Sequence, residues 1–248
     1  GVTNQFIEGW ASESYTEGMY HTWNVHTAYI LNAIGEFYLS KASISTQEIR
    51  QLKEIFAYIE GNWIDLEVGG YFNEPSLKQK NIEIPLNMVS LGGCASLTLY
   101  NLTKEEKYLN YAKQIFLHLQ NNIEIINSCA IWPYKPLQNK TSESLKLSDD
   151  ISHGALVIKF IKMCKNQGIE LSLKNITIAN LDHTFTSIFR EDGKLSKYAY
   201  AEEGKTKNLT YYIFPPHWLM LVSTENFKLY KTFNEKLSLT YDPSTIYN

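Results

Sequence analysis

The sequence predicts an all-α fold, an incomplete (α/α) toroid of about four antiparallel helical hairpins with long loops at one end. Three observations predict it. Apolar residues recur at helical spacing in successive segments, N-capping signals mark several helix starts, and turns of a few residues alternate with much longer connections. If the odd-numbered helices run in the same direction, their N-termini share one end of the molecule with the long loops.

The first hairpin is expected near the start of the chain. Apolar side chains at helical spacing predict a helix over residues 22–40. Ser45 and Glu48 form a capping box, and the apolar stripe that follows predicts a partner helix to about Gly61. Because the connection is short, the two helices should pack as an antiparallel pair.

The second hairpin begins after a long loop, at Leu86, where the helical apolar pattern resumes. Thr103 and Glu106 form a further capping-box pattern, which opens a partner helix through Leu119. The glycine pair at 92–93 lies inside the first of these helices. Glycine there allows a neighbouring element to approach closely, so we expect close helix packing at that point.

The third hairpin follows a segment that ends in Asp149 and Asp150, either of which could cap a helix from Ile151 to about Lys165. A turn at Gln167-Gly168 ends this helix. We expect its partner over residues 172–189.

The fourth pair is shorter. A proline pair at 215–216 starts a short helix, and residues 227–237 give the last helix. We therefore expect a single domain over residues 1–248, in which 1–20 form an extended N-terminal segment and 238–248 a C-terminal tail.

Composition restricts the partners. The net charge is -3 and the basic residues are spread singly, which argues against nucleic acid. Every apolar run is interrupted before the roughly 18 residues that a membrane span needs. Cys94, Cys129 and Cys164 have neither metal-ligand spacing nor the pattern of a disulfide framework. The sequence does not fix the compartment, although an extracellular or periplasmic location is slightly favoured. It does not fix the oligomeric state either.

Arginine is scarce. Arg50 and Arg190 are the two arginines among 23 basic residues, so an anionic substrate would rely on Lys, Asn or His.

The first turns of the odd-numbered helices bring polar and aromatic groups to one rim, where free amides and the helix dipole favour anionic or oxygen-rich ligands. Asp150 is either a helix cap or a catalytic acid, and Asn87 either binds a ligand or bonds loop carbonyls. His118 and His183 lie on outer helices, where we expect structural roles. The rim residues are Trp23, His26, Asn87, Asp150, His153, His217 and Trp218.

Aromatic residues are dense in the long loops. Aromatic faces with polar tips suit sugar rings, which combine apolar C–H faces with hydroxyl edges. The same residues could simply anchor the loops. The aromatics are Tyr15, Tyr20, Trp63, Tyr71, Phe72, Trp132, Tyr134, Tyr198, Tyr200, Tyr211 and Tyr212.

Two motifs resemble a known group. Residues 99–112 (LYNLTKEEKYLNYA) resemble the hairpin signature of α/α-toroid carbohydrate-active proteins, the six-hairpin glycosidase and polysaccharide-lyase group. Residues 132–134 (WPY) followed by 149–155 (DDISHGA) resemble a pattern of its bacterial members, including glucuronyl C5-epimerase-like and alginate-lyase-like proteins. The similarity spans residues 10–222. About four hairpins stand here where six or seven are usual in the group.

The resemblance implies a lyase that cleaves an acidic, uronate-containing polysaccharide by β-elimination, without a metal or cofactor. We assign Asn87 and His153 to neutralising the carboxylate, His26 as base, and Tyr134 or Tyr198 as acid or as a shared acid and base. For substrate binding we assign Trp23, Tyr71, Trp132, Arg190, His217 and Trp218.

Three alternatives stay open. A glycoside hydrolase would use Asp150 with Glu74 or Asp65 as paired carboxylates. A uronyl epimerase is a further enzymatic alternative. A non-catalytic glycan-binding or scaffold domain would retain the saccharide without forming product.

Overall fold

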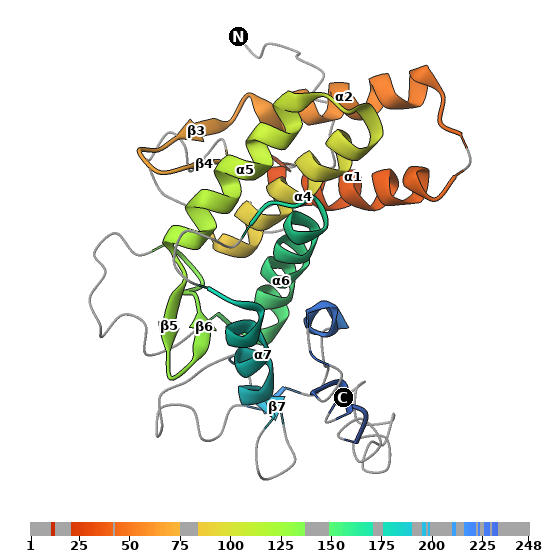
Figure 1. Cartoon of the computed structure of the whole chain (residues 1–248). Coiled ribbons are helices and arrows are strands. Elements are labelled where there is room, and N and C mark those ends of the chain that lie inside the picture. The colour runs from red at the N-terminus through yellow and green to blue at the C-terminus, as the bar shows by residue number, and fades with distance from the viewer. Residues whose placement is uncertain are drawn as a thin grey trace.

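Helices dominate the structure, which has the all-α, toroid-like arrangement that the sequence predicts (Figure 1). It is a computed structural model. Among the described residues no helix is long and apolar enough to cross a membrane. The structure describes residues 11–12, 21–41, 43–74, 84–136, 149–170, 176–189, 195–196, 198, 210–211, 216–221, 223, 226–228 and 230–232.

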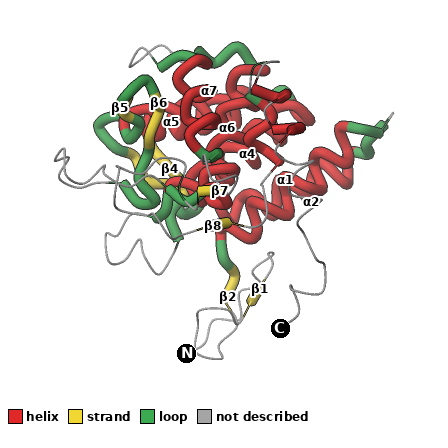
Figure 2. Tube along the Cα trace, turned by 90° about the horizontal axis from the view of Figure 1, so that it is seen from below, coloured by secondary structure: helices red, strands yellow, loops and turns green. Residues whose placement is uncertain are grey.

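Three helices form the inner layer: α1 (Asn24–Leu39), α4 (Leu86–Thr103) and α6 (Ile151–Asn166). The central one is α4, which packs against both of the others. Its outer partner is α5 (Glu106–Asn121), and α1 pairs with α2 (Thr46–Glu60). Figure 2 shows the α1–α2 hairpin extending away from α4, α6 and α7 (Ile178–Ser187).

Contacts between α1 and α4 show that these helices run in parallel. Asn32 donates a hydrogen bond to Thr98 over 2.6 Å, and Gly35, further along α1, faces Leu102, further along α4. Residue numbers therefore rise together along both helices. Their N-termini lie at the same end of the layer, as the loop lengths predict.

The same holds for α4 and α6. Gly93 of α4 lies against the ring of Phe160, and Gln167, which caps the end of α6, donates a hydrogen bond to Asn101 over 2.8 Å. The close packing expected at the glycine pair is confirmed, because a Cβ at Gly92 would lie 2.9 Å from Phe72 and one at Gly93 would overlap Phe160.

Replacing Gly93 with alanine is expected to lower the free energy of unfolding by about 1–3 kcal/mol, because Phe160 is buried and has no room to move. Gly61→Ala is the matched control. Its backbone φ is -61° and the added Cβ would meet only ordinary contacts at 3.6 Å, so it should be neutral or stabilise by about 0.4–1 kcal/mol. Urea denaturation of both variants measures the difference, and equal midpoints would contradict the packing argument.

Some of the predicted helix caps are present in the structure and one is not. The capping box of Ser45 and Glu48 is present, and Asp150 caps α6. The box expected from Thr103 and Glu106 is wrong: α4 continues to Thr103, Lys104 follows in the left-handed conformation, and α5 begins after Glu105 without a side-chain cap.

The third hairpin differs from the prediction. Its partner helix, α7 (Ile178–Ser187), is bounded by a capping box of Thr177 and Asn180, so it begins later than residue 172. It packs against strand β6 (Cys129–Ile131), and no comparable packing on α6 is present among the described residues. The expectation of a tight α6–α7 pair is therefore corrected.

Short β-hairpins occupy the long connections, which the sequence analysis treated as loops. The tightest has a two-residue turn, Asn127-Ser128, with φ of 49° and 67°, as a hairpin turn of the primed type requires. The four hairpins pair β1 (Ala11–Ser12) with β2 (His21–Thr22), β3 (Trp63–Asp65) with β4 (Gly70–Phe72), β5 (Glu124–Ile126) with β6 (Cys129–Ile131), and β7 (Leu195–Ser196) with β8 (Thr210–Tyr211).

The C-terminal part is described in pieces. The expected short helix is the 3-10 helix η1 (Pro216–Met220), which packs on α6, and residues 226–228 and 230–232 are helical. The predictions for most of 1–20, for 238–248, for Arg190 and for Tyr15, Tyr20, Tyr200 and Tyr212 lie outside the described residues.

Candidate functional site

The first turn of α6 is built around Asp150. One carboxylate oxygen, Oδ1, accepts hydrogen bonds from the backbone N–H groups of Ser152 (2.9 Å) and His153 (3.1 Å). The other, Oδ2, lies 2.5 Å from Nδ1 of His153. Aspartate is among the best N-cap residues, and here its second oxygen also orients an imidazole one turn further on. Asp150 is thus a cap and a histidine partner at once.

This pair sets the protonation of His153. Burial raises the pKa of Asp150, but hydrogen bonds from His153 and Ser152 outweigh it and lower that pKa below its usual 3.8. The bond to Asp150 raises the pKa of His153 above its usual 6.5. An ionised carboxylate can only accept, so Nδ1 of His153 donates, and Nε2 belongs to a side chain that is 42% exposed.

Two tyrosines lie beside this pair. The ring of Tyr134 packs against the imidazole of His153, with centroids 5.1 Å apart. Tyr198 forms an antiparallel β-bridge with Asp150. Both tyrosines and both of their partners are site residues expected from the sequence, and they lie together in the structure. Asp150, His153 and Tyr134 are called the His153 cluster below.

Asn87 is linked to this cluster through its neighbour on the chain. The backbone N–H of Leu86 donates to the carbonyl of Tyr134 over 3.0 Å, so the start of α4 lies beside the backbone of Tyr134. Asn87 is 4% exposed, and its Oδ1 has no hydrogen-bond partner within the described part of the chain. An unmade hydrogen bond at a buried amide is costly, so a donor group of a ligand would suit this position.

Asp149 is the acidic residue that the sequence analysis considered only as a cap. Its backbone N–H donates to the carbonyl of Trp132 over 2.9 Å, and its side chain is buried. Burial, with the nearby charge of Asp150, raises the pKa of Asp149 to about 7. Asp149, Asp150 and His153 each offer one ligand atom within 4.8 Å of the others, so they are the described residues that could hold a cation.

Asparagine in place of Asp149 should flatten the pH dependence of stability. Between the unfolded pKa of 3.8 and the folded pKa of about 7 the folded state binds more protons, so stability falls as pH rises through this range. The asparagine variant lacks that titration, and its stability should fall less between about pH 5 and pH 8. Thermal unfolding of both proteins at the two pH values tests this. Equal losses in both would show that Asp149 titrates normally.

Trp132 and Trp218 form a wall behind the His153 turn. Their rings stack 5.9 Å apart, and Nε1 of Trp218 donates to the carbonyl of Ile151 over 2.8 Å. A Cβ at Gly154 would lie 3.1 Å from Trp218, so this glycine lets the indole pack under the helix. Each indole is 1% exposed. The assignment of these two rings to substrate binding is corrected, because the structure buries them. His217 is half-buried on η1, and burial lowers its pKa.

The first turn of α1 carries the other predicted histidine. His26 makes an edge contact with Trp23, with centroids 6.4 Å apart. Among the described residues no hydrogen bond or ring contact links His26 to His153. The two oxygens of Glu74 accept the backbone N–H groups of Asn24 and Val25, each over 3.0 Å, so this buried carboxylate serves as the cap of α1.

Two further assignments lie away from the cluster. Asp65 accepts a hydrogen bond from Nε1 of Trp63 within the β3–β4 hairpin. Tyr71 is 3% exposed and stacks on His118, with centroids 5.0 Å apart, so the structure does not present its ring to a ligand. His118 is buried there, as expected of a structural residue, whereas His183 is exposed on α7.

A polar network crosses the inner layer formed by α1, α4 and α6. Lys159 of α6 donates to Asn32 over 2.6 Å and pairs with Glu36 over 3.1 Å, both on α1. Asn32 in turn donates to Thr98 of α4. The network therefore ties all three inner helices together.

The sequence and the fold were compared with those of known proteins. No family model matches the chain, and no curated protein matches it in sequence. Among solved structures, the fold is similar to that of a sugar epimerase from a ruminal bacterium, with a TM-score of 0.56 and 14% identity. The match covers 87% of this chain and 58% of the epimerase, so this chain spans little more than half of that protein's length. A likeness at this identity shows a shared fold.

Proposed function

We propose that the chain is a carbohydrate-active enzyme that cleaves a uronate-containing saccharide by β-elimination at the His153 cluster. One observation carries the proposal: a partly exposed imidazole, oriented by Asp150 and raised in pKa, lies against a tyrosine at the shared end of the inner helices. An imidazole and a phenol are the pair of groups that a proton-transfer reaction needs.

The reaction begins with neutral Nε2 of His153, which takes the proton from C5 of the uronate. His153 thus replaces His26, the base expected from the sequence, because no hydrogen bond or ring contact among the described residues links His26 to the cluster. The electrons of that C–H bond form the C4–C5 double bond, and the bond from C4 to the bridging oxygen breaks. The hydroxyl of Tyr134 gives its proton to the leaving oxygen. Nδ2–H of Asn87 donates to the uronate carboxylate, whose negative charge grows in the transition state, and the buried Oδ1 of Asn87 accepts from a sugar hydroxyl. Proton exchange with water restores both side chains.

The arrangement supports elimination over epimerisation, because His153 and Tyr134 lie side by side. A base and an acid on one face of the sugar can remove the proton and protonate the leaving oxygen of the same unit. Epimerisation needs groups on opposite faces of one carbon. It is the second candidate, favoured by the likeness of the fold to a sugar epimerase, with His26 of α1 as the opposing group.

A hydrolase with paired carboxylates has less support. Both oxygens of Asp150 are bonded within the first turn of α6, and both oxygens of Glu74 are bonded at the start of α1. Neither carboxylate is placed to attack a sugar or to activate water.

Incubation of the protein with a panel of acidic and neutral polysaccharides in heavy water tests the proposal. Elimination is expected to produce an unsaturated uronate that absorbs in the ultraviolet, and only with acidic polymers. Deuterium at C5 without cleavage would instead indicate epimerisation, and new reducing ends without absorbance would indicate hydrolysis. Retention of a saccharide with no product would show a binding domain. Each of the last three results would overturn the lyase proposal.

A further inference from the structure

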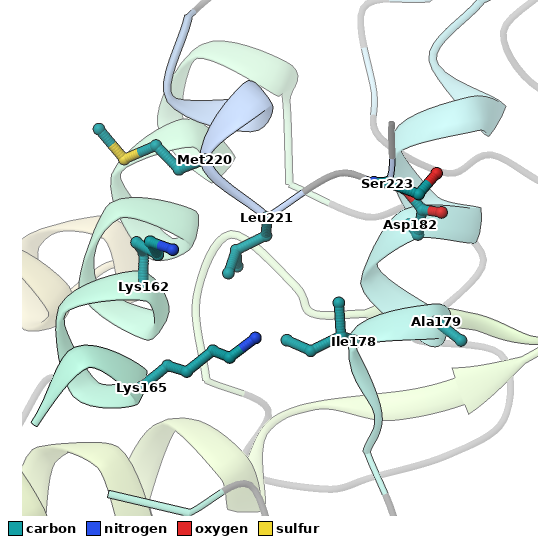
Figure 3. Close-up of a pocket in the computed structure, with 8 residues that line it drawn as sticks. All are labelled: Lys162, Lys165, Ile178, Ala179, Asp182, Met220, Leu221 and Ser223. Atoms are coloured by element: carbon teal, nitrogen blue, oxygen red, sulfur yellow. The ribbon is translucent and has the colours of Figure 1, made fainter. Parts of the chain in front are cut away.

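A recess lies between α6 and α7. It encloses about 400 Å³, within the range of about 300–1,000 Å³ that small-molecule sites occupy. The space is open because α7 packs on β6 rather than on α6. Met220, Leu221 and Ser223, at and after the end of η1, close one side (Figure 3).

One wall of the recess is cationic. Lys162 and Lys165 project from α6, and Figure 3 shows the side chain of Lys165 extending into the space toward Ile178. Within the described residues, neither ammonium group pairs with a carboxylate. Two positive charges therefore border the recess without internal compensation, and an anionic group placed between them would gain charge-assisted hydrogen bonds.

The other walls are apolar and hydrogen-bonding. Ile178, Leu221 and Met220 supply aliphatic surface. Asp182 and Ser223 lie together across from the lysines in Figure 3, and Oδ1 of Asp182 accepts the backbone N–H of Ser223 over 3.0 Å. The recess thus offers cations on one side, a carboxylate and a hydroxyl on the other, and aliphatic surface between them.

We propose that this recess binds one sugar-acid unit, with its carboxylate on Lys162 and Lys165. The C–H face of the ring lies on Leu221 and Ile178, and ring hydroxyls reach Asp182. A neutral sugar would leave the lysines unpaired, and a small inorganic anion would not use the apolar wall. The choice of an acidic saccharide rests on the proposed function.

The recess is separate from the His153 cluster. Lys162 stands nine residues after His153 on α6, which is a rise of about 14 Å and two and a half turns. The two side chains therefore leave the helix on opposite sides. An acidic polymer or its product would be held here at a second place on the same domain.

The test titrates D-glucuronate, D-glucose and inorganic sulfate into the isotope-labelled chain and follows backbone amides by NMR. Glucuronate is expected to shift the amides of Ile178, Ala179 and Ser223, whereas glucose leaves them unchanged and sulfate binds more weakly. The proposal is overturned if glucuronate leaves these amides unmoved. Equal binding of sulfate and glucuronate would also overturn it, since the apolar wall would then contribute nothing.

Lysine substitutions test which charges bind the carboxylate. Lys162→Met with Lys165→Met removes both charge-assisted hydrogen bonds and is expected to weaken glucuronate binding by more than about tenfold, the effect of losing a single one. Lys113→Met, an exposed lysine on α5, is the matched control and should bind as the wild type does. An unchanged affinity in the double variant would contradict the proposal.

The same titration separates this inference from the proposed function. The His153→Ala variant should keep the amide shifts of the recess while losing any lyase activity. If the wild type shows these shifts but forms no product from any polymer, the lyase proposal fails and the recess stands. If product forms and the shifts are absent, the recess proposal fails alone.

Discussion

Replacing His153 with alanine is expected to lower kcat/KM on an acidic polysaccharide by about 10²–10⁴-fold, the usual contribution of a positioned proton-transfer group. The side chain of His153 is partly exposed, and its Nδ1 is fixed by Asp150. Asp150→Asn should also lose activity, because an amide has no ionised oxygen to hold the imidazole. The substitution also removes the main cause of the raised pKa of His153. In that variant the acidic limb of the pH–rate profile should move to lower pH.

His183→Ala is the control for this prediction. That histidine is exposed on α7, outside the His153 cluster, and its replacement should leave kcat/KM unchanged. Initial rates measured by the absorbance of the unsaturated product, with circular dichroism to verify folding, give the comparison. Full activity of a folded His153→Ala protein would remove His153 from the mechanism.

Replacing Trp218 with alanine should produce the largest loss of stability, about 3–5 kcal/mol, because a fully buried aromatic side chain leaves a cavity. The variant also loses the stack on Trp132 and the hydrogen bond to Ile151. Trp218→Phe keeps most of the ring but not the N–H donor, so a smaller loss of about 1 kcal/mol is expected. In both variants KM should stay unchanged at temperatures where the protein is folded.

The KM measurement decides between two roles of this residue. A sugar-stacking tryptophan would raise KM when replaced, with little effect on unfolding. A buried wall residue shifts the unfolding midpoint instead. Phe37→Ala, which removes an aromatic ring that is 58% exposed, is the control and should change stability by no more than about 0.5 kcal/mol.

The helices were predictable because their signals are local. The apolar periodicity of α1 and the capping box at Ser45 each depend on a few neighbouring residues, and the structure contains both. The β-hairpins were missed because strands of two or three residues carry too little periodicity to detect. The turn at Asn127-Ser128 was a usable signal, since asparagine tolerates positive φ more readily than most residues do.

The candidate site was predictable where its parts adjoin in sequence. Asp150 and His153 are three residues apart at a helix start, which is the distance that lets a cap bond an imidazole. The raised pKa of Asp149 depends on burial, which no local pattern reports. The network of Asn32, Thr98 and Lys159 joins three helices far apart in the chain, and tertiary packing alone brings them together.

The burial of Trp132 and Trp218 reflects the same limit. A tryptophan in a loop has the same local sequence signal whether it faces a groove or packs under a helix. The small residue that admits it, Gly154, lies on α6, and only the packed structure shows the two in contact.

An NMR titration of the His153 imidazole, in the wild type and in Asp150→Asn, tests most directly that Asp150 sets the state of this histidine. The wild-type pKa should lie above 6.5 with the hydrogen of the neutral ring on Nδ1, and the variant pKa should fall toward the usual value. A wild-type pKa at or below 6.5, or the same pKa in both proteins, would contradict the assignment of this pair to proton transfer.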